Sequence, residues 1–176
     1  MLYAGRGTRE LSFAAADPAV PPAFFFVSFP AHAAHPVTAA PRSGADCTVI
    51  GTAEGASRRT LCKYIHPGGV RSCQLVMGLT ELAPGSVWNT MPPHTHMRRT
   101  EVYLYFDLGP DDIVVHLMGT PQETKNLMLH DRQGAISPGW SIHCGAATRP
   151  YAFVWAMGGE NQDFADMDAV PARALR

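Results

Sequence analysis

Several features are scarce in this 176-residue sequence, and each absence narrows the class of protein. Acidic and basic side chains nearly cancel, 15 against 14, so no charge excess indicates a polyanionic partner. The longest apolar stretch near the start, "PPAFFFVSFPA", is far too short to span a bilayer and lacks the basic flank of a secretory signal. We therefore expect a protein of the cytoplasm that has neither nucleic acid nor a membrane as its partner.

Cysteine is also sparse. The four cysteines, Cys47, Cys62, Cys73 and Cys144, form no C-x-x-C pair and lack the density of a secreted disulfide scaffold. We expect four free thiols in a reducing compartment. The alternative is two disulfide bridges.

Helical periodicity is nearly absent, and only "NQDFADMDAV" before Pro171 is compatible with a helix. Beyond Arg71, short runs rich in Val, Ile, Leu, Tyr and Phe alternate with breaks of Gly, Pro, Asp and Asn. This pattern predicts an all-β sandwich or small barrel. The expected strands are 73–82, 101–106, 113–118, 124–130, 134–137, 142–146 and 151–157.

Residues 1–70 differ in texture because they carry many alanines and prolines. Strands are expected at 10–13, 24–29, 47–50 and 60–65, and "PAHAAHPVTAAPRSGAD" reads as a long irregular connection. We predict two parts: an incomplete β unit or arm over 1–70, and the main β domain over 71–176.

The most informative stretch is "NTMPPHTHMRRTEVYLYF", which begins at Asn89. His94 and His96 are two apart, so on a strand they project to the same side and can meet one ion. Glu101 lies an odd number of positions from His96, so a turn or bulge through "MRRT" is needed to bring it to the same point. A third imidazole is available from His143 after the Pro-Gly turn of "SPGWSIHCG".

Three imidazoles and one carboxylate make a donor set suited to Zn, Fe, Mn, Co or Ni, and we expect one Zn²⁺ per chain. A catalytic ion would keep one position open for water or substrate. An HxH pair alone also fits two solvated loop histidines. The longer order of HxH, glutamate, Gly109 and a later Pro-Gly-turn histidine favours the metal site.

These residues resemble the two motifs of the cupin superfamily, with Gly85, the HxH pair and Glu101 in the first and Pro138 five before His143 in the second. This sequence departs from the usual cupin motifs in two places. The spacing between Gly85 and His94 is longer, and the glycine of the second motif stands at position 139 and not at 140. Longer stretches closely resemble the 5-dehydro-4-deoxy-D-glucuronate isomerase family, also called 4-deoxy-L-threo-5-hexosulose-uronate ketol-isomerases. They are "CQLVMGLTELAPGSVWNTMPPHTHMRRTEVYLYF", "HLMGTPQETKNL", "ISPGWSIHCG" and "WAMGGENQDFADMD".

The resemblance implies a cupin, a double-stranded β-helix or jelly-roll barrel, preceded by a partial second β unit. It implies that four residues are zinc ligands: His94, His96, Glu101 and His143. It also implies a homo-oligomer, because family members resemble hexamers. Family members are longer at the N-terminus by roughly a hundred residues, about the length of one domain. Residues 1–70 thus resemble the back part of an N-terminal β domain and a linker.

The family reaction converts 5-dehydro-4-deoxy-D-glucuronate to 3-deoxy-D-glycero-2,5-hexodiulosonate in pectin breakdown. Such an aldose-ketose isomerisation needs a metal electrophile and a base. The base could be a metal-bound hydroxide or one of Glu101, Glu160, Glu123 and His116. Glu160 could instead only shape a turn, and His116 could be a core histidine.

A uronate substrate carries a carboxylate, so we expect a cationic anchor from Arg98, Arg99, Lys125 or Arg149. Tyr105, with Tyr103 on the same face, could hydrogen-bond sugar hydroxyls. The alternatives are solvated rim charges and core packing.

Three other functions stay open at this point. One is the related isomerase that acts on 5-deoxyglucuronate in inositol catabolism. The second is a non-catalytic cupin that binds a sugar acid, or a truncated remnant. The third is an Fe(II) dioxygenase, because the same ligands can hold iron.

Overall fold

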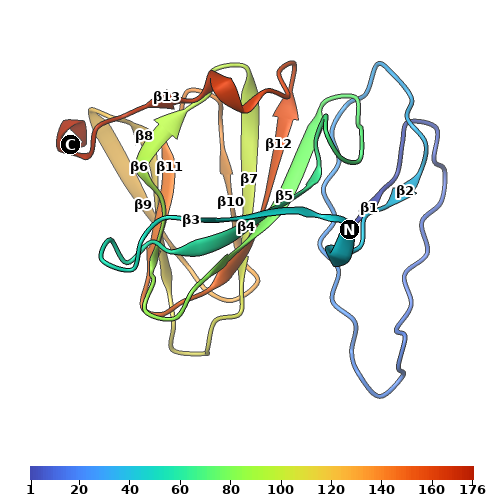
Figure 1. Cartoon of the computed structure of the whole chain (residues 1–176), viewed down its shortest axis with the longest axis horizontal. Helices are drawn as coiled ribbons and strands as arrows, with labels where there is room; N and C mark the ends of the chain where they lie inside the picture. Colours follow the sequence, from blue (N-terminus) through green and yellow to red (C-terminus); the bar gives the residue numbers. More distant parts are fainter.

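The computed structural model describes residues 1–176 and confirms the all-β fold. A six-stranded and a five-stranded antiparallel sheet face each other and form the barrel of a cupin (Figure 1). The six-stranded sheet has the order β10 (Gly134–Ser137), β7 (Arg99–Phe106), β12 (Ala152–Gly159), β5 (Leu75–Leu82), β4 (Arg59–Ile65) and β3 (Asp46–Ile50). The five-stranded sheet has the order β13 (Asp168–Ala169), β6 (Trp88–Thr95), β11 (His143–Ala147), β8 (Val114–Thr120) and β9 (Glu123–Leu129).

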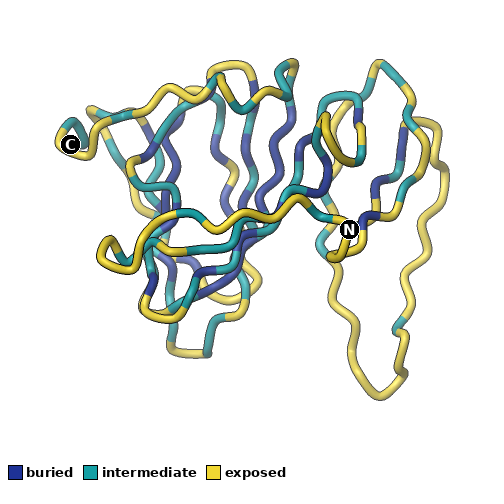
Figure 2. Tube along the Cα trace, in the orientation of Figure 1, coloured by how far each residue is buried: buried dark blue, intermediate teal, exposed yellow.

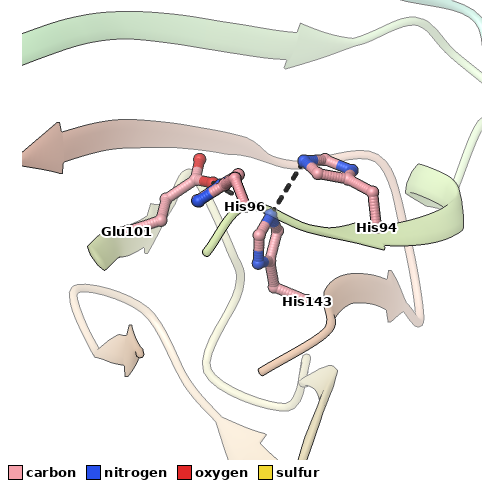
Figure 3. Close-up of side chains that lie close together, drawn as sticks. All are labelled: His94, His96, Glu101 and His143. Carbon is pink, nitrogen blue, oxygen red and sulfur yellow. Dashed lines mark hydrogen bonds and ion pairs between the residues drawn. The ribbon is translucent and has the colours of Figure 1, made fainter. Parts of the chain in front are cut away.

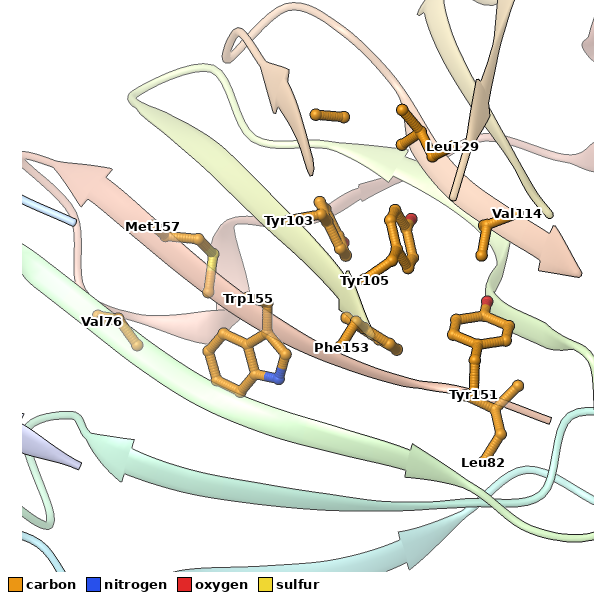
Figure 4. Close-up of a cluster of buried hydrophobic side chains, with 11 residues drawn as sticks. Val76, Leu82, Tyr103, Tyr105, Val114, Leu129, Tyr151, Phe153, Trp155 and Met157 are labelled. Atoms are coloured by element: carbon orange, nitrogen blue, oxygen red, sulfur yellow. The ribbon is translucent and has the colours of Figure 1, made fainter. Parts of the chain in front are cut away.

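The core fills the space between the two sheets (Figure 2). Burial alternates strictly along β5 and β7, as the two-residue period of a strand requires when one face packs on the core. Tyr103, Tyr105, Phe153 and Trp155 point inward from neighbouring strands and provide much of the apolar area (Figure 4). Aromatic side chains thus fill much of the barrel interior.

All seven strands predicted beyond residue 71 are present, with ends within two residues of those expected. Two strands in this part were missed, the two-residue β13 and the longer β6. Pro92 and Pro93 interrupt it and Thr90 has a positive φ of 53°, so its pairing with β11 skips residues 90–93. Prolines cannot donate to a strand ladder, which is why the stretch does not read as a strand in the sequence.

The first half of the chain differs more from expectation. β3 and β4 are present, but the predicted strands over 10–13 and 24–29 are wrong: both stretches are irregular and largely exposed. No neighbouring strand offers them a ladder, and β1 (Leu2–Tyr3) pairs only with β2 (Thr38–Ala39). β4 pairs with β5, so the six-stranded sheet already begins at Asp46, ahead of the predicted boundary at 71. The origin of residues 1–70 in a longer N-terminal domain stays a prediction.

Short 3₁₀ turns are the only helical elements: η1 (Arg42–Gly44), η2 (Phe164–Asp166) and η3 (Ala172–Ala174). The predicted helix in "NQDFADMDAV" is therefore wrong. This segment crosses from one sheet to the other and ends as β13, so tertiary pairing overrides its weak helical pattern. No helix in the structure has the length and apolar character needed to cross a membrane.

The expectation of four free thiols is wrong for Cys47 and Cys62, which form a disulfide. The two residues are direct cross-strand partners in the β3–β4 hairpin, with Cα atoms 4.0 Å apart. Sequence spacing does not reveal this pairing because it depends on the hairpin register. Cys73 and Cys144 are free.

Candidate metal centre

Three imidazoles and one carboxylate meet between the two sheets of the barrel (Figure 3). His94 lies on β6, His96 just after it, Glu101 on β7 and His143 at the start of β11. One ligand atom from each lies within 4.8 Å of every other, although His94 and His143 are 49 positions apart. This cluster could hold a metal ion.

The turn between β6 and β7 explains how Glu101 meets His96 although an odd number of positions separates them. The chain leaves the five-stranded sheet after Thr95 and enters the six-stranded sheet at Arg99. His94 and Glu101 therefore reach the same point from opposite walls of the barrel, which no single strand could achieve. The predicted turn through "MRRT" is present, with the Arg99 N–H donating to the His96 carbonyl at 3.4 Å.

The contacts of the two His96 ring nitrogens show whether the cluster fits a metal ion. His96 Nδ1 lies 3.1 Å from the Arg99 carbonyl, which can only accept, so Nδ1 carries the proton. In the neutral ring His96 Nε2 is then an unprotonated acceptor, and it lies 2.9 Å from Glu101 Oε2. Two acceptors at this distance repel unless a cation or proton lies between them. The arrangement fits a divalent metal with a carbonyl behind its imidazole ligand.

Electrostatics keep two of the ligands, His94 and Glu101, in the forms that bind metals. Burial and the neighbouring His143 lower the pKa of His94 to about 3, so it is neutral at pH 7. Burial alone would raise the pKa of Glu101, but charge interactions and hydrogen bonds with His143 and His96 outweigh burial and hold this pKa below its ordinary value. Neutral imidazole and ionised carboxylate are the required ligand states.

The base candidates are spread over different environments. His116 is fully buried on β8, with Nδ1 2.8 Å from the Tyr105 hydroxyl and Nε2 without a partner. It pairs across the sheet with Gly145, two residues from His143, so it lies one layer below the cluster. Glu160 and Glu123 are exposed, and the structure does not bring them to the cluster.

The basic residues predicted to bind the substrate carboxylate also lie in different environments. Arg98 is exposed in the turn, whereas Arg99 is buried and its Nη2 lies 2.6 Å from Asp166 Oδ1. Lys125 is exposed on β9 opposite Met118, and it shares the inward face of that strand with Leu127 and the buried Leu129.

The remaining candidates lie deeper or further out. Tyr105 is wholly buried in the aromatic core, and Arg149 is exposed beside Asp112, 3.5 Å away. Tyr105 packs in this core, and its contact with a sugar hydroxyl stays a prediction.

Sequence reasoning missed two polar groups, Ser137, which contacts a cluster histidine, and Asp166, which contacts the turn that carries the cluster. Ser137 Oγ lies 3.3 Å from His143 Nδ1, and Asp166 reaches Arg99 from 67 positions away. No local pattern marks either one, because each contact depends on how the tail and β10 pack.

Fold and site together define a cupin-type barrel with a His₃Glu cluster between its two sheets. The chain belongs to the KduI/IolB family, whose model matches residues 1–171. It is 56% identical over 178 residues to a Kineococcus radiotolerans protein named 4-deoxy-L-threo-5-hexosulose-uronate ketol-isomerase, covering 99% of this chain and 64% of that protein. A Dickeya dadantii protein of the same name is 49% identical over 175 residues, with 99% and 63% covered.

Among solved structures, the chain is similar to an IolB-like protein from Salmonella typhimurium LT2, with a TM-score of 0.66. The identity is 13%, and the match covers 80% of this chain and 56% of the other. At this identity the likeness concerns the fold alone. The chain spans somewhat less than two thirds of the length of these curated relatives.

Proposed function

We propose that this chain is a zinc-dependent aldose-ketose isomerase that converts 5-dehydro-4-deoxy-D-glucuronate to 3-deoxy-D-glycero-2,5-hexodiulosonate in polyuronate breakdown. The convergence of His94, His96, Glu101 and His143 carries the proposal, because it supplies one site for a Lewis acid. The name of relatives at 49% to 56% identity supports the substrate and reaction. The ion would polarise the substrate carbonyl and stabilise the charge that develops when the carbon-bound proton leaves.

For the base we propose His116 in preference to Glu160 or Glu123. Its unpartnered Nε2 is on the inward side of β8, one layer from the cluster, whereas both glutamates are exposed. The Tyr105 hydroxyl can accept from Nδ1–H at 2.8 Å, which leaves Nε2 free to take up a proton.

For the carboxylate anchor we propose Lys125. Arg99 is already paired with Asp166, so its charge is compensated. Lys125 is exposed and shares the inward-facing side of β9. An ammonium group at this position could pair with the carboxylate of a substrate bound beside the cluster.

The decisive experiment compares the wild-type chain with His96→Ala, and uses His130→Ala as the matched control because His130 is exposed and outside the cluster. We expect one zinc per wild-type and control chain by elemental analysis, and turnover when unsaturated-uronate breakdown product is supplied. His96→Ala should lose both while its far-ultraviolet β signal persists. A zinc-loaded wild-type chain without turnover would contradict the isomerase function.

A second candidate is the isomerase that acts on 5-deoxyglucuronate. It is favoured by the family model, whose description joins the two types. Parallel assays with the two uronates distinguish the candidates by which substrate turns over. Size-exclusion chromatography of the same samples tests the expected homo-oligomer, and a metal-free aggregate would indicate a remnant.

A further inference from the structure

The residues after β12 form a C-terminal strap, which we define as residues 160–170. The strap leaves the six-stranded sheet, passes through η2 and joins the five-stranded sheet as β13 (Figure 1). There Asp168 pairs with Thr95 and Ala169 with His94, and the Val170 N–H donates to the Pro93 carbonyl at 2.9 Å. The strap therefore links the two walls of the barrel at the end that carries the His₃Glu cluster.

One buried ion pair fastens the strap to the ligand-bearing turn. Arg99 Nη2 lies 2.6 Å from Asp166 Oδ1, and the two side chains are 0% and 15% exposed. The Phe164 ring lies 5.5 Å from the Arg99 guanidinium and packs edge-on against Trp155. Both Phe164 and Asp166 belong to η2, so this single turn of the strap holds the Arg99 side chain.

The backbone of Arg99 in turn orients a ligand. Its carbonyl oxygen is 3.1 Å from His96 Nδ1, so it fixes the ring position and leaves Nε2 for the cluster. The space around this carbonyl is closed, because a Cβ on Gly139 would lie 3.0 Å from the Arg99 carbonyl oxygen, and one on Gly159 2.6 Å from the Arg99 Cα. A displacement of Arg99 would therefore move His96.

Stability alone does not account for the pair. Arg99 Nε, Arg99 Nη1 and Asp166 Oδ2 are buried without hydrogen-bond partners. A buried ion pair with unmet polar groups contributes little net stability compared with apolar residues of similar size. Its geometric effect on the turn is the stronger reason for its presence.

We propose that Asp166 is a positioning residue of the metal centre, which acts through Arg99 to hold His96 with Nε2 directed at the ion. The inference rests on the metal centre of the proposed function and is independent of the substrate. Asp166 does not touch the ion or the reacting atoms.

The test compares Asp166→Asn with Asp168→Asn, the matched control whose exposed side chain belongs to the same strap. Zinc affinity is measured by competition with a chromogenic chelator, and the thermal unfolding of the metal-free chains is recorded beside it. We expect Asp166→Asn to bind zinc about ten- to a hundredfold more weakly, and Asp168→Asn to bind within about twofold of the wild type. A lower unfolding temperature with unchanged zinc affinity would show a merely structural role and overturn the inference.

Arg99→Lys keeps the charge opposite Asp166 but lacks the planar fork, so it provides a second variant if Asp166→Asn does not fold. We expect weaker zinc binding from this variant too, and wild-type affinity in a folded Arg99→Lys chain would count against the inference. Because the assay needs no substrate, a wild-type chain that binds zinc without turnover overturns the isomerase proposal only. A wild-type chain that fails to bind zinc overturns both.

Discussion

His116 illustrates how burial alone changes the chemistry of one residue. It is fully enclosed in the barrel, and burial lowers its pKa to about 4. A histidine in the unfolded chain has a pKa of about 6.5. Between these two values the unfolded chain takes up a proton that the native protein excludes.

The stability of the folded chain should therefore fall as the pH decreases from about 6.5 to about 4, and should not depend on His116 above that window. Between pH 7 and pH 5 we expect the wild type to lose ~2 kcal/mol more unfolding free energy than His116→Gln, since glutamine keeps a polar contact with Tyr105 and does not titrate. Urea unfolding of the metal-free chains at both pH values measures the difference. Equal pH dependence in the two proteins would show that His116 is protonated in the native state.

At the scale of the element, the centre of the six-stranded sheet is packed without spare volume. Gly78 on β5 faces Trp155 of β12, and a Cβ there would lie 2.1 Å from the indole ring and 2.6 Å from the Cys62 carbonyl oxygen. The indole is held in place by its N–H, which donates to Thr80 Oγ1 at 3.1 Å. Neither neighbour can yield without moving a strand.

We expect Gly78→Ala to lower the free energy of unfolding by roughly 3 kcal/mol or more, because overpacking of a rigid core forces backbone shifts. Gly44→Ala is the control, since its added Cβ would find its nearest neighbour 3.9 Å away. Denaturant midpoints of the two variants and the wild type measure the effect. A Gly78→Ala chain as stable as the control would mean that β5 and β12 can separate freely.

At the scale of the whole molecule, the His₃Glu cluster joins the two sheets as well as offering a site for an ion. Its histidines come from the five-stranded sheet and the turn that follows β6, and Glu101 comes from the six-stranded sheet. An ion bound there would cross-link the two sheets of the barrel. Because the unfolded chain has no such site, binding would favour the folded state.

We therefore expect zinc at a thousandfold excess over its Kd to raise the stability of the wild-type chain by about 4 kcal/mol relative to the chelated protein. His143→Ala should show a much smaller zinc response, because the cluster loses one of its four ligands. Its metal-free stability should lie within ~2 kcal/mol of that of the metal-free wild type. Thermal unfolding with zinc and with a chelator gives both values. A zinc response of the same size in His143→Ala would place the ion elsewhere.

What the sequence determined by itself is local in origin. Strand periodicity predicted seven strands of the barrel to within two residues, since alternation reflects which face is buried. The side-chain chemistry of His94, His96, Glu101 and His143 indicated a metal site before any distance was known. The resemblance to a family placed these residues in one barrel.

Only the tertiary structure decided the features that depend on contacts between distant segments. The Cys47–Cys62 disulfide follows from hairpin register, and the role of the tail as β13 follows from a free edge of β6 beside Pro93. The Arg99–Asp166 pair joins residues 67 apart, so no local pattern could reveal it. The β13 pairing and the Arg99–Asp166 contact form only when the two sheets close, because closure brings segments together whose own sequences carry no preference for each other.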